Sequence, residues 1–171
     1  MKDLSKVILG TGSYDSVSFG NCVSVTGDGG NAWGFYGASY KKLAPRLTTY
    51  IPYSEKYEEL LKLKSDLKKY LDFRKIIEDE YIKSYYDLRL KDLDVKALLY
   101  TLSNKFGDSI ILLCHEPIDE FCHRRLIADY IELKLGFYIP EVSVDNSGKV
   151  KKLNPIRYKD RLLKVINDGS R

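Results

Sequence analysis

The stretch SIILLCHEPIDEFCHRRLIADYIELKLG, residues 109–136, decides the fold. Its first part, residues 109–114, is a continuous apolar run, which is typical of a strand covered on both faces in a parallel sheet. From Leu126 to Leu135 apolar residues recur at helical spacing, and Gly136 is placed to end that helix. The stretch therefore predicts a strand, a loop and a helix in succession, the unit from which parallel α/β sheets are built.

Further strands are predicted on both sides of this unit. The apolar run 7–9 predicts a buried strand that ends in a turn at residues 10–13, where two glycines occur. Alternating β-branched residues predict a second strand at 22–26, and another strand is expected at 137–144. Five glycines between residues 27 and 37 predict a long, adaptable loop.

Three amphipathic helices are predicted in the middle of the chain. The first runs from about residue 54 to 70 with Ser54 as its N-cap, and the second from about 74 to 90. The third covers residues 95–106 behind an N-cap at Asp94. Helices that alternate with strands in this order predict βαβ crossovers.

The chain has 171 residues, of which 44% are hydrophobic and 30% charged, the composition of one globular domain. We predict a single three-layer α/β domain over residues 1–145, with a mostly parallel, Rossmann-like sheet flanked by helices. Residues 146–171 are expected to form a basic extension with a short helix packed on the same domain. From Asp145 onwards eight Lys and Arg residues face three Asp residues, so the net charge of +4 comes from this end.

Several features indicate a cytoplasmic protein with no membrane partner. The N-terminus mixes charged and apolar residues, unlike a secretory signal, and no apolar run approaches the roughly 18 residues that span a bilayer. The three cysteines, Cys22, Cys114 and Cys122, are too few for a disulfide scaffold and are expected to be reduced. The sequence leaves the oligomeric state open.

Reactive side chains gather around the loop between the predicted strand and helix of residues 109–136. In an open parallel sheet, ligands bind beyond the carboxyl ends of the strands, where the next helix presents its N-terminal amides. Arg124 is suited to bind a phosphate or carboxylate, since its guanidinium group makes paired hydrogen bonds to such anions. The predicted catalytic residues, which supply thiols, a carboxylate and an imidazole, are Cys114, Glu116, Cys122 and His123.

The same residues allow two other interpretations. Cysteine is often buried, so Cys114 and Cys122 fit simple packing, while His123 and Arg124 fit surface ion pairs. Zinc is a further alternative, with Cys114, Cys122, His123 and Glu116 as ligands. Structural zinc ligands usually come two to four residues apart, and neighbouring residues on a strand point to opposite faces. No cofactor and no metal ligand are therefore predicted.

A second, weaker ligand-binding signal lies at the predicted turn near the N-terminus. Two glycines let a backbone approach a phosphate closely, although a third glycine and the lysine of a P-loop are missing. The candidate ligand-binding residues there are Gly10, Thr11, Gly12 and Ser13. Aromatic side chains such as Trp33, Tyr36 and Tyr40 offer faces for a stacked base, or packing in the core.

The motif ILLCHE at 111–116 followed by CHRRLIA at 122–128 resembles the bacterial and phage family named domain of unknown function 488 (DUF488). That family shows an apolar strand ending in Cys-x-Glu, then Cys-His-Arg opening a helix. YKKLAP at 40–45 and EYIKSY at 80–85 are similar to further family segments, so the resemblance covers about residues 6 to 142. It implies an α/β fold and adds Tyr81 and Tyr85 as ligand-binding candidates. This chain departs from the family in carrying His115 inside the motif.

The family has no settled activity, so the reaction stays open. The first hypothesis is an enzyme that acts on a nucleotide-like or phosphate-bearing small molecule, with a small anionic ligand as its partner. The alternatives are a non-catalytic module that binds a nucleotide or, through the basic tail, a nucleic acid, and a phage or host interaction protein with structural cysteines. The sequence does not decide whether the protein is an enzyme.

Overall fold

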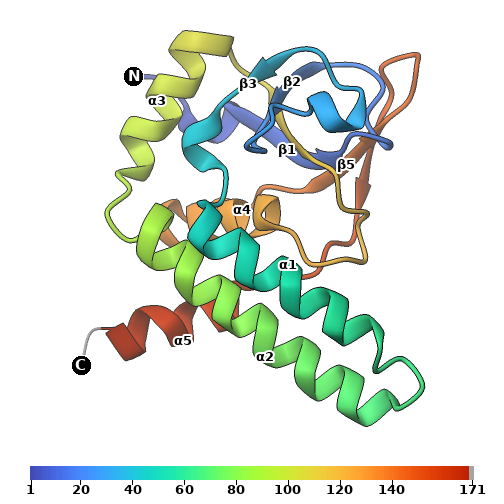
Figure 1. The fold of residues 1–171 in the computed structure, drawn as a ribbon. Helices are drawn as coiled ribbons and strands as arrows, with labels where there is room; N and C mark the ends of the chain where they lie inside the picture. Colours follow the sequence, from blue (N-terminus) through green and yellow to red (C-terminus); the bar gives the residue numbers. More distant parts are fainter. Residues whose placement is uncertain (170–171) are drawn as a thin grey trace. The chain divides into compact units, whose positions relative to one another are not determined.

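The computed structural model describes residues 1–169, which divide into two compact units. The first unit consists of residues 1–44 and 92–159 and contains the sheet. The described part of the second unit consists of residues 45–91 and 160–169, and it is helical (Figure 1). The predicted boundary at residue 145 stays a prediction.

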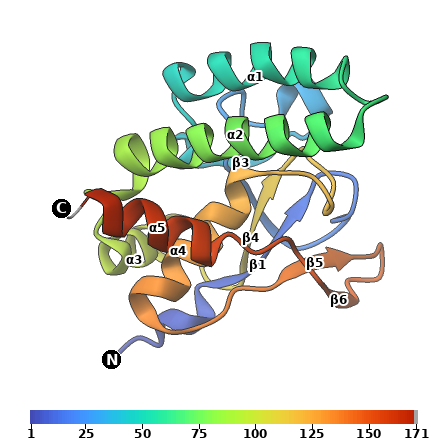
Figure 2. The same cartoon turned by 90° about the horizontal axis from the view of Figure 1, so that it is seen from below.

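The first unit is built on one six-stranded sheet with strand order β3-β2-β4-β1-β5-β6. All neighbouring strands are parallel except β5 and β6, which pair antiparallel and are seen side by side in Figure 2. The α/β fold with a mostly parallel sheet is thus confirmed. The strands are β1 (Ile8–Ser13), β2 (Asn21–Ser24), β3 (Ala38–Ser39), β4 (Ile110–Cys114), β5 (Glu141–Val144) and β6 (Val150–Leu153).

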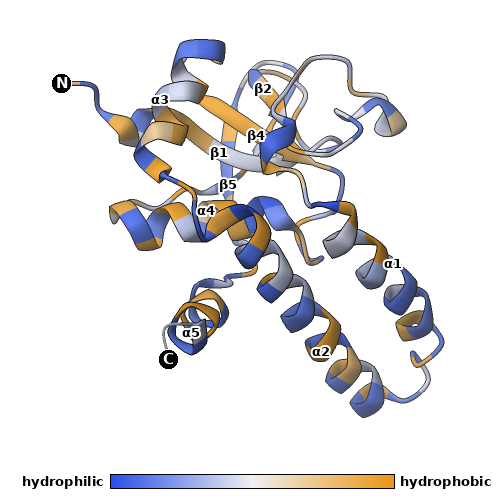
Figure 3. Cartoon of the chain, turned by 60° about the vertical axis from the view of Figure 1, so that its left-hand side comes forward, coloured by the Kyte–Doolittle hydropathy of each residue, from blue (hydrophilic) through white to orange (hydrophobic). Residues whose placement is uncertain are grey.

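Strand β4 lies between β2 and β1, and all five of its residues are buried, as its apolar run predicts (Figure 3). Its alternate residues Ile111 and Leu113 pack with Val17 and with Val142 and Val144 of β5. Ser13 at the end of β1 is level with Cys114 at the end of β4. The carboxyl ends of the two central strands therefore meet at one edge of the sheet, where ligands of parallel sheets bind.

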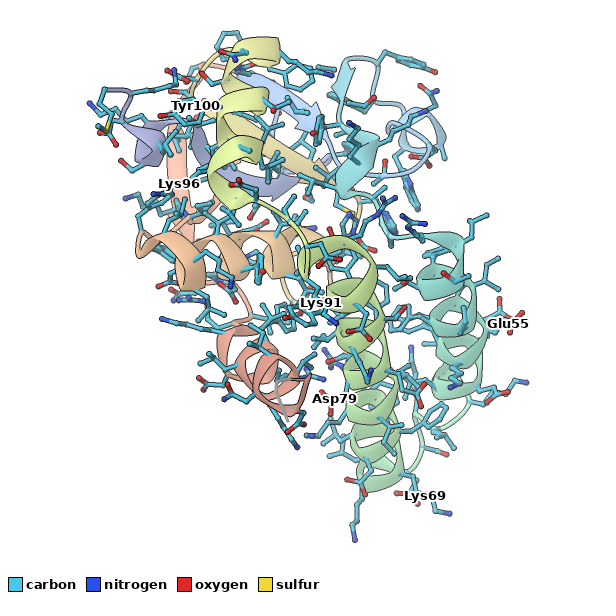
Figure 4. The ribbon with its side chains drawn as sticks, turned by 90° about the vertical axis from the view of Figure 1, so that its left-hand side faces the viewer. Glu55, Lys69, Asp79, Lys91, Lys96 and Tyr100 are labelled. Carbon is cyan, nitrogen blue, oxygen red and sulfur yellow. The ribbon has the colours of Figure 1, made fainter. Side chains whose placement is uncertain are left out.

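Two helices of the first unit match their predictions closely. Helix α3 (Val95–Phe106) begins behind Asp94, whose carboxylate accepts the backbone N–H of Ala97 at 3.0 Å. Lys96 and Tyr100 lie on its exposed face (Figure 4). Helix α4 (His123–Leu135) joins β4 to β5, packs along β1 and β4, and ends at Gly136 in the left-handed conformation. Short 3-10 helices lie at Leu4–Lys6, Asn31–Trp33 and Lys41–Leu43.

The turn predicted at residues 10–13 is wrong, because strand β1 continues to Ser13. The two glycines serve close packing of β5 against β1. A Cβ at Gly10 would lie 2.8 Å from the carbonyl oxygen of Pro140, and one at Gly12 would lie 2.6 Å from Val17 Cγ2. Glycine is usually a turn signal, but here it lets a neighbouring backbone approach.

The second unit contains an antiparallel pair of helices, α1 (Leu47–Leu61) and α2 (Leu67–Tyr85), followed by one π-helical turn at Tyr86–Leu90 (Figure 1). The predicted start of the first helix at Ser54 is wrong, since α1 begins at Leu47 and tolerates Pro52 within it. The predicted break at 70–74 is also wrong. Asp66 caps α2 instead, accepting the N–H of Lys69 at 3.2 Å.

The C-terminal residues contain strand β6, which was not predicted, and helix α5 (Lys159–Gly169), which agrees with the predicted short helix. Within the second unit, Arg161 of α5 binds Glu78 at 2.9 Å and Asp79 at 2.8 Å, both on α2. Figure 4 labels Asp79 on α2, with the exposed Glu55 and Lys69 on α1 and α2. Part of the basic surplus is thereby used in ion pairs.

The glycine packing predicts a difference between two substitutions. Gly12→Ala should lower the free energy of unfolding by about 1–3 kcal/mol, since its Cβ overlaps Val17 and nothing flexible can yield. Gly27→Ala is the matched control, because a Cβ there meets nothing within 4 Å. Urea denaturation followed by circular dichroism measures both. Equal stability of the two variants would contradict the packing role of Gly12.

Candidate functional site

The four predicted catalytic side chains converge where β4 ends and α4 begins. Cys114 is the last residue of β4, Cys122 is the N-cap of α4 and His123 is its first residue. The Nδ1 atom of His123 lies 3.8 Å from Cys114 Sγ and 4.0 Å from Cys122 Sγ. The donor atoms of these three residues all lie within 4.8 Å of one another. Residues eight positions apart in the sequence therefore form one cluster.

Glu116 joins this cluster from the loop that follows β4. The thiol of Cys114 donates a hydrogen bond of 2.8 Å to Glu116 Oε2. On the other side, His115 Nε2 lies 3.2 Å from Glu116 Oε1. The side chains of His115 and Glu116 are 28% and 21% exposed, whereas both thiols are buried. Glu116 and His115 are thus the members of the cluster that solvent reaches.

The orientation of His123 is set by a backbone carbonyl. Its Nε2 lies 2.8 Å from the carbonyl oxygen of Val25. A carbonyl oxygen only accepts hydrogen bonds, so Nε2 carries the hydrogen and donates it. The neutral ring then presents the lone pair of Nδ1 to the side on which the two sulfur atoms lie.

The two thiols have opposite acidities because their surroundings differ. Burial alone raises the pKa of a thiol. At Cys122 the hydrogen bond with Cys114, the charge of Arg124 and the hydrogen bond with His123 outweigh burial and hold the pKa well below its usual value. At Cys114 burial and the interaction with Cys122 raise the pKa well above it. The surroundings therefore favour deprotonation of Cys122 over that of Cys114, whose thiol donates to Glu116.

The carboxyl and imidazole groups respond to the same charge. Burial and the nearby Cys122 raise the pKa of Glu116 to about 8, despite the hydrogen bond from Cys114. Burial lowers the pKa of His115. For His123 burial acts in the same direction, but the hydrogen bond and charge of Cys122 prevail and raise its pKa. The charge of Cys122 thus acts on all three neighbours, adding to burial at Glu116, opposing it at His115 and outweighing it at His123.

Arg124, predicted to bind an anionic ligand, is buried and paired with Glu141 of β5. Its Nε lies 3.0 Å from Glu141 Oε1, and its Nη2 lies 3.0 Å from the same oxygen. Among the described residues its Nη1 has no hydrogen-bond partner. Cys122 and Glu141 raise the pKa of Arg124 against the effect of burial. Arg124 therefore fixes the first turn of α4 to β5 and places a positive charge next to Cys122.

Arg125 extends this buried network to β1. Its Nη1 donates to Thr11 Oγ1 at 2.8 Å and to the carbonyl oxygen of Ile139 at 2.9 Å, while its Nη2 lies 3.6 Å from Asp129 Oδ1. Thr11 in turn donates to Glu141 at 2.7 Å. Thr11 is thus occupied by protein partners on α4 and β5.

The other predicted ligand-binding residues lie in regular elements. Ser13, at the end of β1, donates to Ser16 Oγ at 2.9 Å, and Gly10 and Gly12 face β5 as described above. Tyr81 and Tyr85 are buried on α2 in the second unit, where their rings stack with centroids 6.1 Å apart. A ligand-binding role for any of them stays a prediction.

Residues from the N-terminal part of the chain complete the polar surroundings, and the sequence analysis missed most of them. The hydroxyl of Tyr14 lies 2.7 Å from Ser24 Oγ and 2.9 Å from Thr26 Oγ1. Thr26 donates to Asp28 at 2.6 Å, and Asp28 also accepts the N–H of Gly30 at 2.8 Å. The only sign of these residues in the sequence was that small polar residues follow two predicted strands whose carboxyl ends lie at the same edge of the sheet.

Trp33, named as a candidate for base stacking, lies flat on the imidazole of His115. The ring centroids are 4.2 Å apart and the planes differ by 3°. Trp33 is 54% exposed, so this aromatic pair lies at the solvent side of the cluster. It places a planar apolar surface next to Glu116, which contacts His115.

No protein-family model, curated protein or solved structure gives a significant match to this chain. The resemblance to the DUF488 family therefore stays a prediction that rests on the quoted motifs. Among residues 1–169, no helix is both long enough and apolar enough to cross a membrane.

The buried ion pair yields a stability prediction. Glu141→Gln keeps the shape of the side chain but leaves Arg124 without its counter-charge, which should cost about 3 kcal/mol in the free energy of unfolding. Asp87→Asn removes the exposed partner of Lys83 and should cost less than about 0.5 kcal/mol. Thermal or urea denaturation of both variants makes the comparison. A loss at Glu141 no larger than that at Asp87 would show that the pair does not anchor α4.

Proposed function

We infer that the protein is an enzyme that acts on a nucleotide-like or other phosphate-bearing small molecule at the carboxyl edge of its parallel sheet. The reacting cluster is Cys114, Glu116, Cys122 and His123. The proposal includes the Rossmann-like placement of the ligand beyond the strand ends, a three-layer domain, and a cytoplasmic setting in which the cysteines stay reduced.

The observation that carries the proposal is the convergence of two thiols, an imidazole and a carboxyl group at one strand end. The closest contact is the 2.8 Å hydrogen bond from Cys114 to Glu116. Placing several ionisable groups together in a buried position costs desolvation free energy, and such an arrangement is a common mark of active sites. Packing alone gives no reason for this combination.

Within the cluster, Glu116 is suited to transfer protons. Glu116 accepts a hydrogen bond from the Cys114 thiol at 2.8 Å and remains partly exposed, and the neighbouring His115 lies 3.2 Å from its other carboxylate oxygen. A general acid or base must reach the substrate within hydrogen-bonding distance, which the buried Cys122 and His123 cannot do from the solvent side. We therefore assign proton transfer to Glu116 and the support of its position and charge to the thiols and His123.

A phosphate-bearing ligand is supported by charge and shape near this edge. Helix α4 presents its N-terminus there, and Nη1 of Arg124 is buried without a hydrogen-bond partner among the described residues. The Trp33–His115 stack adds an aromatic face suited to a planar base. The pairing of Arg124 with Glu141 makes part of the guanidinium group a structural element, so Nη1 is the part of Arg124 that remains for an anion in the enzyme and in the binding-module alternative alike.

The enzyme proposal predicts that Glu116→Gln separates turnover from binding. At least one member of a panel of nucleotides and sugar phosphates should raise the melting temperature of the wild-type protein and be converted to product, measured by mass spectrometry. Glu116→Gln should keep the thermal shift and lose at least about 100-fold in turnover, because the amide cannot exchange a proton. Glu120→Gln, an exposed change in the same loop, is the matched control and should keep both.

The outcomes separate the hypotheses. A thermal shift without conversion by the wild-type protein would support the binding module instead of the enzyme. No shift across the whole panel would overturn the phosphate-bearing ligand, and unchanged turnover in Glu116→Gln would remove Glu116 from the chemistry.

A further inference from the structure

We propose that Cys114, Cys122 and His123 form a binding site for a single thiolate-preferring divalent metal ion, Zn²⁺, with Glu116 at the fourth position. The inference goes beyond the proposed function, because the site would hold the ion whether or not a substrate is converted. It rests on the types of donor atom, their spacing, the orientation of the imidazole and the rigidity of the elements that carry them.

The spacing of the donor atoms matches a tetrahedral zinc centre. Bonds of about 2.3 Å to sulfur and 2.0 Å to nitrogen place neighbouring ligand atoms roughly 3.5 to 3.8 Å apart. His123 Nδ1 lies 3.8 Å from Cys114 Sγ and 4.0 Å from Cys122 Sγ. Small side-chain rotations thus suffice to bring the three atoms onto one ion.

The hydrogen bond of His123 is the one that a metal-binding histidine makes. Metal-ligating histidines commonly donate their second ring N–H to a carboxylate or backbone carbonyl, which fixes both tautomer and ring orientation. His123 Nε2 donates to the carbonyl oxygen of Val25 at 2.8 Å. Nδ1 is the remaining ring nitrogen, and it lies within 4.0 Å of the sulfur atoms of both Cys114 and Cys122.

The ligands are carried by rigid elements that the rest of the unit holds in place. Cys114 ends the fully buried strand β4, and Cys122 and His123 open helix α4. The first turn of this helix is tied to β5 by the pair Arg124–Glu141 and to β1 by the bond from Arg125 to Thr11. The site is therefore formed before any ion binds, which reduces the ordering cost of binding.

The fourth ligand position and the net charge of the site are also compatible with a zinc ion. Glu116 Oε2 lies 2.8 Å from Cys114 Sγ, so a rotation of its partly exposed side chain brings the carboxylate next to the three-ligand site. Two thiolates neutralise a divalent ion, and the extra negative charge of a Glu116 carboxylate is offset by the nearby Arg124. Without Glu116, the three remaining ligands would leave the fourth position to water or substrate, as in catalytic zinc centres. The buried sulfur donors favour zinc over magnesium or calcium, which prefer oxygen ligands.

Cobalt binding provides the direct test. Titration of the metal-free, reduced wild-type protein with Co²⁺ should give intense sulfur-to-cobalt charge-transfer absorption and tetrahedral visible bands that saturate at one ion per chain, and Zn²⁺ should abolish both. Protein produced without a histidine tag should contain close to one zinc per chain by elemental analysis. Absence of the charge-transfer bands in the folded wild-type protein would overturn the proposal without recourse to any variant.

Substitutions locate the ion. Cys114→Ser and Cys122→Ser should each lose most of the sulfur-to-cobalt absorption, and Cys22→Ser is the matched control that should keep all of it, since Cys22 lies on β2 outside the cluster. Circular dichroism verifies folding of each variant. Equal cobalt absorption spectra for all three variants would contradict the assignment of Cys114 and Cys122 as ligands. If the fully metal-free protein still converts substrate, zinc has no role in catalysis, but the metal site itself is unaffected. If the zinc-loaded protein converts nothing, the proposed enzymatic function is overturned while the metal site stands.

Discussion

The buried ion pair between Arg124 and Glu141 is the interaction on which the rest of the site depends. It joins the first turn of α4 to β5 at 3.0 Å and so fixes where Cys122 and His123 stand relative to the end of β4. Burying two charges is costly, and the pair persists only because the geometry is good and Thr11 supplies a further hydrogen bond. The same guanidinium group lowers the pKa of the Cys122 thiol. Arg124 therefore both holds the first turn of α4 in place and affects the charge of the thiol beside it.

The strand and helix that carry the cluster follow from local sequence. The apolar run of β4, the Asp94 cap of α3 and the glycine that ends α4 each act within a few residues, and all three predictions are confirmed. The failures have two different causes, one distant in the sequence and one local. Gly10 and Gly12 look like turn residues, yet they are needed for the approach of β5, a segment about 130 residues away that no local pattern reveals. The helix break was misplaced because the cap at Asp66 was overlooked.

The candidate site likewise combines residues that the local sequence predicted with partners that it did not. Its four central residues were predicted from motif and position. Val25, which binds His123, and Glu141, which holds Arg124, come from distant segments, and their contacts were not predicted. The argument against zinc rested on the short spacing of structural zinc ligands and on neighbouring strand residues, such as Cys114 and His115, pointing to opposite faces. It did not consider that two residues at a helix start can both face the end of a strand. Cys122 has extended backbone as the N-cap, with φ −151°, and His123 already belongs to the helix, so both side chains reach Cys114. The sequence pattern could not predict this backbone conformation at the start of the helix.

A crystal structure of the untagged, reduced protein with anomalous data at the zinc edge tests the central claim most directly. The account predicts one anomalous peak surrounded by the sulfur atoms of Cys114 and Cys122 and by Nδ1 of His123, with the Nε2 of that ring still bound to Val25. Side chains splayed apart at this sheet edge, or the absence of an anomalous peak next to the two sulfur atoms, would contradict it.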